Sequence, residues 1–210
     1  MTILSKLANA QEGRGEGRNI ELAKTIALAG DEAAVNELVK NLSNKKREIQ
    51  NDCIKTLYEI GERKPALIAD YYEDFIQLLD SKNQRLIWGA ITALSKITLQ
   101  QPEAIYEALP QILEAVDKTQ SVIARDHTVY ILAELSTVER YNEAFELLIE
   151  IIMKAPVNQL AMYAEKAGEV ATKSNKSILS EALICRLEDL EQEPKRKRIE
   201  KVLKKLEKIS

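Results

Sequence analysis

The residue types most often used in catalysis are scarce in this 210-residue chain, which contains one histidine and two cysteines. His127 has Asp126 beside it, but adjacent residues of a helix point about 100° apart, so the two do not suit a catalytic triad. A zinc site would need more His, Cys or grouped carboxylate ligands. Cys53 and Cys185 lie far apart and form no CxxC pair, so we expect two buried free thiols in a reducing cytoplasm. We therefore predict no catalytic residue, metal or cofactor, and a hydrogen-bonding role for His127 at the surface or between helices.

Carboxylates form the most regular polar pattern in the chain. On a helical wheel, three segments carry acidic or amide side chains opposite their apolar stripes. These residues are Asp70, Glu73, Gln77 and Asp80; Glu103, Glu107, Gln111 and Glu114; and Glu139, Glu143, Glu146 and Glu150. None of these three acidic stripes contains Lys, although solvated helix faces usually mix charges. A Glu-rich solvated surface would explain the pattern, because Glu favours helices. The alternative is a surface that binds a basic peptide, a basic protein face or a polyamine-like ligand. A metal site is less favoured, because carboxylates on one helix face without an oxygen-rich loop make poor calcium sites.

Basic residues gather at the C-terminal end. Residues 194–210 hold eight basic and two acidic side chains, a net charge of +6, so the rest of the chain carries −9 while the whole carries −3. An apolar stripe within the same segment indicates a docked capping helix whose basic side faces solvent. Such a helix can bind nucleic acid or anionic lipid, or contact the acidic face of another copy of the chain. The acidic stripes argue against DNA, whose phosphates require Lys or Arg.

The N-terminal segment is expected to be a short helix followed by a flexible joint, over residues 1–18. Three of the seven glycines lie within residues 13–17, and this stretch lacks the Lys-Ser/Thr of a phosphate-binding P-loop. The first residues form too short an apolar run for a signal peptide, and no run of 18 apolar residues is present to span a membrane. We therefore expect a cytoplasmic protein.

The remaining chain, 19–210, has the apolar spacing of helices throughout. One stripe recurs along the sequence as Ile49, Cys53, Leu57 and Ile60; as Leu86, Ala90, Leu94 and Ile97; and as Ala124, Thr128, Leu132 and Leu135. A second set of stripes lies between them, and Pro110 predicts a kink in one of those. We expect helix pairs at 19–43, 46–80, 83–117, 119–154 and 156–191, closed by the basic helix at 194–210. Few aromatic, Gly and Pro residues argue against a β-sandwich or barrel.

Two-helix units with a period between 35 and 38 residues resemble HEAT repeats of the armadillo-like superfamily. The resemblance rests on the core positions Leu86, Ala90, Ile91, Leu94 and Ile97 and on the segment 122–132, and it covers residues 19–191. It implies an all-α fold: a right-handed α-α superhelix (solenoid) of about five HEAT-like helix pairs with a C-terminal capping helix. HEAT proteins place their second helices along the concave surface, where this chain would present its acidic stripes.

The same superfamily suggests an alternative function, because HEAT-like alkylpurine DNA glycosylases have a comparable chain length. Trp88 and Arg125 are the best matches to the aromatic and Arg side chains of their basic concavity. Those enzymes have an Asp one turn after the Trp, where this chain has Thr92. On the wheel Arg85, Thr92 and Lys96 face outward, with Trp88 at the edge of that face. Trp88 is therefore expected to pack over a neighbouring helix or to anchor a partner.

These patterns together predict a noncatalytic scaffold or adaptor that binds a basic protein or peptide on an acidic helical face. The residues expected to contact the partner are Asp70, Glu73, Glu103, Glu107, Glu114, Glu143, Glu146, Glu150, Arg85 and Trp88. A DNA-binding enzyme and a structural module of a larger assembly are the alternatives. The basic C-terminal helix also suggests self-association.

Overall fold

The computed structural model describes residues 2–8 and 17–209, so the Gly-rich joint up to residue 16 lies outside the described residues. Every regular element among the described residues is an α-helix or a short 3-10 turn. The chain divides into two compact units, Met1–Thr128 and Val129–Ser210, which we call the N-terminal and C-terminal units. The boundary falls within helix α8, and each unit is described below by itself.

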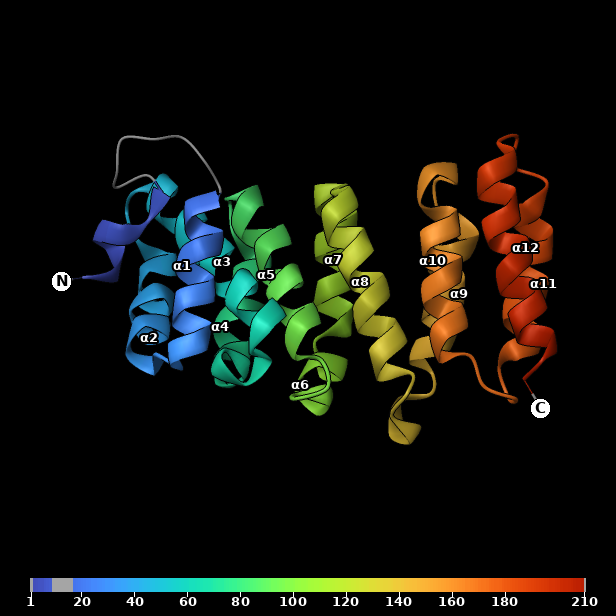
Figure 1. Cartoon of the computed structure of the whole chain (residues 1–210), viewed down its shortest axis with the longest axis horizontal. Coiled ribbons are helices and arrows are strands. Elements are labelled where there is room, and N and C mark those ends of the chain that lie inside the picture. The colour runs from blue at the N-terminus through green and yellow to red at the C-terminus, as the bar shows by residue number, and fades with distance from the viewer. Residues whose placement is uncertain (1, 9–16, 210) are drawn as a thin grey trace. The chain divides into compact units, whose positions relative to one another are not determined.

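The helices follow one another with short connections (Figure 1). In the N-terminal unit they are α1 (Gly17–Ala29), α2 (Glu32–Lys40), α3 (Arg47–Arg63), α4 (Tyr72–Gln77), α5 (Gln84–Ile97), α6 (Pro102–Glu107) and α7 (Leu109–Thr119). After α8 (Val122–Leu135), the C-terminal unit contains α9 (Ala144–Lys154), α10 (Val157–Val170), α11 (Lys176–Leu187) and α12 (Glu193–Glu207). Short 3-10 turns cover Ile3–Lys6, Asn41–Ser43, Pro65–Leu67, Ala69–Tyr71, Leu78–Asp80 and Glu139–Tyr141.

Helix α3 is the centre of the N-terminal unit and packs between α1 and α5 (Figure 1). Its predicted apolar stripe is inaccessible to solvent at Cys53, Leu57 and Ile60, whereas Ile49 is half-buried at the start of the helix. Gly89 on α5 allows this close approach, because a Cβ there would lie 2.7 Å from Ile54 Cγ1. The stripe of α5, predicted at the equivalent positions, is buried throughout. These aliphatic contacts supply the core, as expected from the low aromatic content.

The N-terminal 3-10 turn is attached to this core by a buried polar contact. Asn19 Oδ1 accepts a hydrogen bond from the backbone N–H of Ala8 at 3.0 Å. The Asn19 amide in turn donates to Asp52 Oδ1 on α3, at 2.8 Å. Both side chains are buried, so each needs the other as a hydrogen-bond partner. The contact therefore fixes where the described N-terminal residues rejoin the helical stack.

Two segments that were expected to form long helices are interrupted. Residues 65–80 contain only the short helix α4 between 3-10 turns, and Ile68 and Ala69, which join two of these turns, are both buried. Residues 102–119 divide into α6 and α7 at Ala108, two residues before Pro110, which lacks the N–H needed to continue the α6 ladder. The predicted disruption at Pro110 is thus a helix break.

In the C-terminal unit, α10 packs against α12 as well as α9, and α11 contacts both α9 and α12. The side chain of Arg186 links α11 to the backbone at the end of α9. Its guanidinium donates to three carbonyl oxygens at the end of α9, those of Ile152, Met153 and Ala155, at 2.7, 2.6 and 2.8 Å. The last turn of a helix leaves its carbonyls without the regular intrahelical donors, and of these three the Ile152 carbonyl also accepts the backbone N–H of Ala155 at 3.2 Å. Arg186 therefore caps α9 from a neighbouring helix.

Polar contacts between successive helix pairs repeat the sequence period. Asn83 is the N-cap of α5, and its amide also donates to Asn51 on α3, 32 residues earlier. The bond from Arg186 to Ala155 spans 31 residues, and that from Lys195 to Asn158 spans 37. Within each of the two units, successive helix pairs are thus joined by polar side chains as well as by the apolar core.

Candidate functional site

All twelve members of the three acidic stripes are exposed to solvent, including those on the interrupted helices. In the N-terminal unit, the stripes of α4 and α6 lie close to each other at Tyr72. The Tyr72 hydroxyl donates to Glu73 Oε1 at 3.2 Å, and this bond raises the pKa of the phenol. The nearby charge of Glu107 adds to that rise. Carboxylates from two successive helix pairs therefore act on one side chain and form a shared negative surface.

Lysines partly neutralise two of the stripes. Lys118 pairs with Glu114 at 2.7 Å and Lys154 pairs with Glu150 at 3.6 Å, each one helical turn further along. All four side chains are at least 60% exposed, so water and salt screen both pairs and each contributes little to stability. The stripes themselves contain no Lys, but their C-terminal flanks do. The negative charge is therefore concentrated toward Glu73 and Glu107 rather than at the end of α7.

The aromatic and charged side chains on α3 and α5 largely bind one another. The ring of Trp88 lies against that of Tyr58, with centroids 6.2 Å apart, and the Arg85 guanidinium lies 5.8 Å from the Trp88 ring. Trp88 is half-buried and Arg85 exposed, as the wheel predicts. Thr92, predicted to face outward, is instead buried and donates to the Trp88 carbonyl. Helix α5 packs against several elements, so more of its circumference is covered than one apolar stripe suggests.

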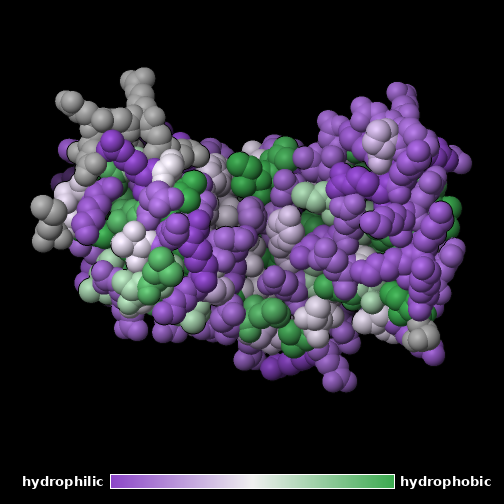
Figure 2. Space-filling view, in the orientation of Figure 1, coloured by the Kyte–Doolittle hydropathy of each residue, from purple (hydrophilic) through white to green (hydrophobic). Residues whose placement is uncertain are grey.

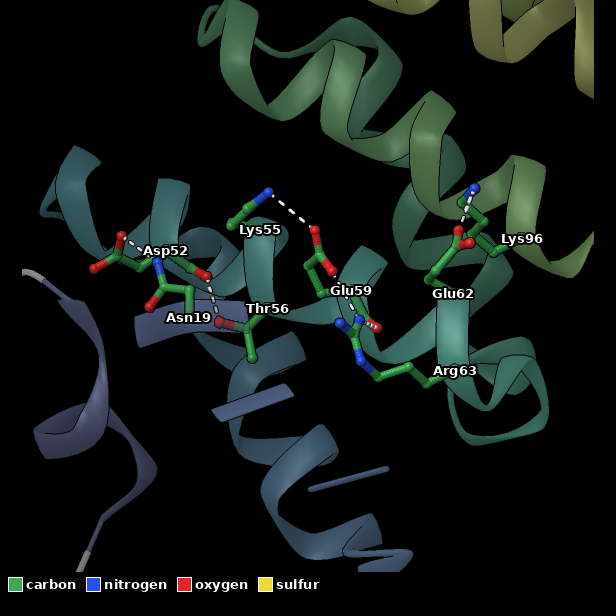
Figure 3. A network of polar contacts seen from close by, with 8 residues as sticks. All are labelled: Asn19, Asp52, Lys55, Thr56, Glu59, Glu62, Arg63 and Lys96. Carbon is green, nitrogen blue, oxygen red and sulfur yellow. Dashed lines mark hydrogen bonds and ion pairs between the residues drawn. The ribbon is translucent and has the colours of Figure 1, made fainter. Parts of the chain in front are cut away.

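Ion pairs continue this network along α3 (Figure 3). Glu59 accepts from both Lys55 and Arg63, at 3.0 and 2.7 Å. Glu62 pairs with Lys96 at 2.6 Å and so joins α3 to α5. Because charges of both signs are matched here, this face offers less unbalanced charge to a partner than the acidic stripes do.

His127 has the environment of a structural residue. Its Nδ1 lies 2.9 Å from Ser95 Oγ, between α8 and α5, and the Ser95 hydroxyl donates its proton to the Thr92 carbonyl. Which of the two groups donates in the contact between His127 and Ser95 depends on the tautomer of the imidazole. Burial, and secondarily the charge of Lys96, lowers the pKa of His127 to about 4, so the ring is neutral near pH 7. The predicted inter-helix hydrogen bond is present.

The two cysteines differ, which corrects the expectation that both are buried. Cys53 is inaccessible in the core of α3, and burial raises the pKa of its thiol to about 12. Cys185 is exposed on α11. The short apolar spacing of α11 places Leu179, Ala182 and Leu183 in the core, so residue 185 falls on the opposite side of the helix. Only Cys185 is accessible to reagents.

Two properties of residues 2–8 and 17–209 bear on function. No three His, Cys, Asp or Glu side chains in this part of the chain are grouped closely enough to hold a metal ion. No helix there is long and apolar enough to cross a membrane. The basic C-terminal residues lie on α12, with Ile199, Val202 and Leu206 buried beneath them. Sequence reasoning did not find the groove that this helix forms with α10, because the groove depends on the spacing between two backbones.

Comparison with known proteins identifies the architecture. No protein-family model and no curated protein matches the sequence. Among solved structures, a designed armadillo repeat protein in complex with the peptide (KR)4 aligns with a TM-score of 0.65 at 20% identity, over 89% of this chain and 86% of that chain. The fold is an armadillo/HEAT-like helical repeat. Another designed armadillo repeat protein aligns with the present chain at a TM-score of 0.62 and 16% identity, over 97% of this chain and 98% of that chain. An engineered protein aligns with a TM-score of 0.63 at 18% identity, over 99% of this chain and 97% of that chain.

Proposed function

We propose that this protein is a noncatalytic scaffold or adaptor that binds a basic protein or peptide segment on its acidic stripes. The observation that carries the proposal is the shared negative surface of α4 and α6, where Glu73 and Glu107 both act on Tyr72. Exposed carboxylates of one sign attract a basic partner and orient it before short-range contacts form. One structural relative, a designed armadillo repeat protein, holds the basic peptide (KR)4, which is a partner of the same charge class.

The side chains of the proposed contact residues are exposed to solvent, apart from that of Trp88, which is half-buried. They are Asp70, Glu73, Glu103, Glu107 and Glu114, then Glu143, Glu146 and Glu150, together with Arg85 and Trp88. The carboxylates would provide the attraction, and the Trp88 ring would provide apolar area. In this proposal the protein works in the cytoplasm, where a reducing environment keeps the exposed Cys185 thiol free.

A noncatalytic role is favoured over a DNA-binding enzyme. The stripes would repel a phosphate backbone, because duplex binding depends on Lys and Arg that displace counterions. Trp88, the best match to a glycosylase aromatic residue, contacts Tyr58 on the neighbouring helix. A salt-dependent binding assay with duplex DNA separates the two functions, since the scaffold should show no binding while the enzyme should bind.

The test is binding of a fluorescent (KR)4 peptide, followed by anisotropy at low salt. We expect saturable binding to the wild-type protein. Reversing the charge of two exposed carboxylates, in E73K/E107K, should remove about 2 kcal/mol at about 1 kcal/mol per exposed contact, which weakens binding roughly 30-fold. The control E21K/E181K changes net charge equally at two exposed positions outside the stripes and should bind almost as well as wild type. Equal affinities for the two variants would refute the acidic site.

A further inference from the structure

The helices α10 and α12 enclose a groove with a volume of about 540 Å³ in the C-terminal unit. Five basic side chains of α12 line it, and α10 contributes Glu165 and Glu169. The basic residues are Arg198, Lys201, Lys204, Lys205 and Lys208. Hydrophilic side chains cover most of the visible surface over these two helices (Figure 2). The groove is therefore a polar surface feature with an excess of positive charge.

Contacts between and within α10 and α12 hold the walls of the groove, and both of its carboxylates, Glu165 and Glu169, take part in them. Gly168 lets the helices approach, because a Cβ at this position would lie 2.8 Å from Val202 Cγ1. Lys205 Nζ donates to the Gly168 carbonyl at 2.9 Å. Arg198 binds both oxygens of Glu165, at 2.8 and 2.6 Å. Glu169 pairs with Lys166 at 3.0 Å, and the charge of Lys201 adds to that of Arg198 in lowering the pKa of Glu165.

Five basic side chains and two carboxylates line the groove, so it keeps an excess of positive charge, to which Lys201, Lys204 and Lys208 contribute. Within the described part of the chain, no carboxylate lies at ion-pair distance from Lys201, Lys204 or Lys208. Their spacing of three and then four residues places them on one face of the helix. They form a row of positive charge along the groove, which a partner with a matching row of carboxylates would complete.

We propose that this groove binds the acidic stripe around α9 of a second copy of the chain, so that the protein associates with itself. Glu143, Glu146 and Glu150 are exposed and have the same spacing of three and four residues as Lys201, Lys204 and Lys208. Oppositely charged rows with equal spacing along two helices can pair residue by residue. The proposal rests on the proposed function in one respect, because it uses an acidic stripe as a binding surface.

A second copy suits this groove better than a nucleic acid does. The chain outside residues 194–210 carries a net charge of −9, which opposes the approach of a uniformly negative polymer. Glu165 and Glu169 also lie in the groove, and they would face the phosphates. A second copy, in contrast, carries both signs of charge, −9 outside residues 194–210 and +6 within them, so its acidic stripe can approach the basic groove.

The experiment is sedimentation of the full chain at an ionic strength of about 0.02 M and again at about 0.5 M, where exposed charges are screened. We expect concentration-dependent association at low salt and its loss at high salt. K201E/K204E/K208E should weaken association more than tenfold, whereas K24E/K40E/K82E, with the same net charge at exposed positions of the N-terminal unit, should not. E146K/E150K should also be monomeric, and mixing it with K201E/K204E/K208E should restore a complex because both charge rows are then exchanged.

Several outcomes would overturn the proposal. The proposal fails if the wild-type protein stays monomeric at high concentration and low salt. It also fails if K201E/K204E/K208E and K24E/K40E/K82E weaken self-association equally. A mixture of the two reversed variants that fails to associate would show that these rows do not face each other. These failures are separable from failure of the proposed function. A monomeric protein that still binds (KR)4 through Glu73 and Glu107 keeps its scaffold role, and an associating protein that ignores (KR)4 loses it.

Discussion

The burial of His127 between α8 and α5 makes the stability of the N-terminal unit dependent on pH. In the folded protein the pKa of His127 is about 4, against 6.5 for an ordinary histidine. Between these values the unfolded chain binds a proton that the folded chain does not, so stability falls as the pH decreases from about 6.5 to about 4. A difference of this size corresponds to about 3 kcal/mol, at 1.36 kcal/mol per pKa unit. That is a large fraction of the stability of a typical domain.

His127 is the only histidine in the chain, so its pKa can be measured directly. Proton NMR of the imidazole should show one titrating histidine with a midpoint well below pH 6. Urea unfolding at several pH values between about 7 and 5 should show stability decreasing with acidification in the wild type more than in His127→Gln. The carboxylates titrate in both proteins, so the difference isolates the histidine.

Two further substitutions test the direction in which neighbouring charges shift the pKa of His127. Lys96→Met removes the positive charge that lowers the pKa of His127, so the pKa should rise. Glu62→Gln removes the negative charge that opposes this effect, so the pKa should fall. A histidine pKa near 6.5 in the folded wild type would refute the account, and so would shifts of equal sign in the two variants.

Two predictions concern the C-terminal unit and the thiols. Replacing Arg186 by Met should lower the free energy of unfolding by about 2–4 kcal/mol, because three carbonyls at the end of α9 lose a charged donor. Arg186→Lys should recover only part of this, since an ammonium cannot reproduce the planar guanidinium fork; chemical denaturation measures both, and full recovery by Lys would contradict the geometry. A thiol reagent should modify Cys185 alone in the native protein and both cysteines after unfolding, since Cys53 is inaccessible. Cys185→Ser should abolish the native reaction, and rapid native reaction of that variant would show that Cys53 is accessible.

The helical architecture was predictable because apolar periodicity records burial directly. The stripe predicted on α5 is buried throughout, since one side of that helix faces the core along its length. The same method failed where the chain leaves regular helix, as at Ile68 and Ala69, because a wheel assumes one continuous helix. It also placed Thr92 outside, since a wheel cannot show how many neighbours surround a helix.

The candidate surfaces were predictable to different degrees. Exposure of the acidic stripes follows from their position opposite apolar residues, and it needs no knowledge of the neighbouring repeats. The proximity of Glu107 to Tyr72 depends on how successive pairs align, which the local sequence does not specify. The groove beside α12 depends on Gly168, whose role appears only when the distance to Val202 is known.

The hydrogen bonds that span 31 to 37 residues have a consequence for how such a chain can change over time. Each one reaches back a single helix pair, so the polar contacts of a pair are satisfied by its immediate neighbour. A duplication or deletion of one whole pair would preserve the register of these contacts, whereas loss of half a pair would leave donors such as Asn83 without their acceptors. The number of binding helices can therefore grow or shrink in discrete steps while the packing rules stay the same.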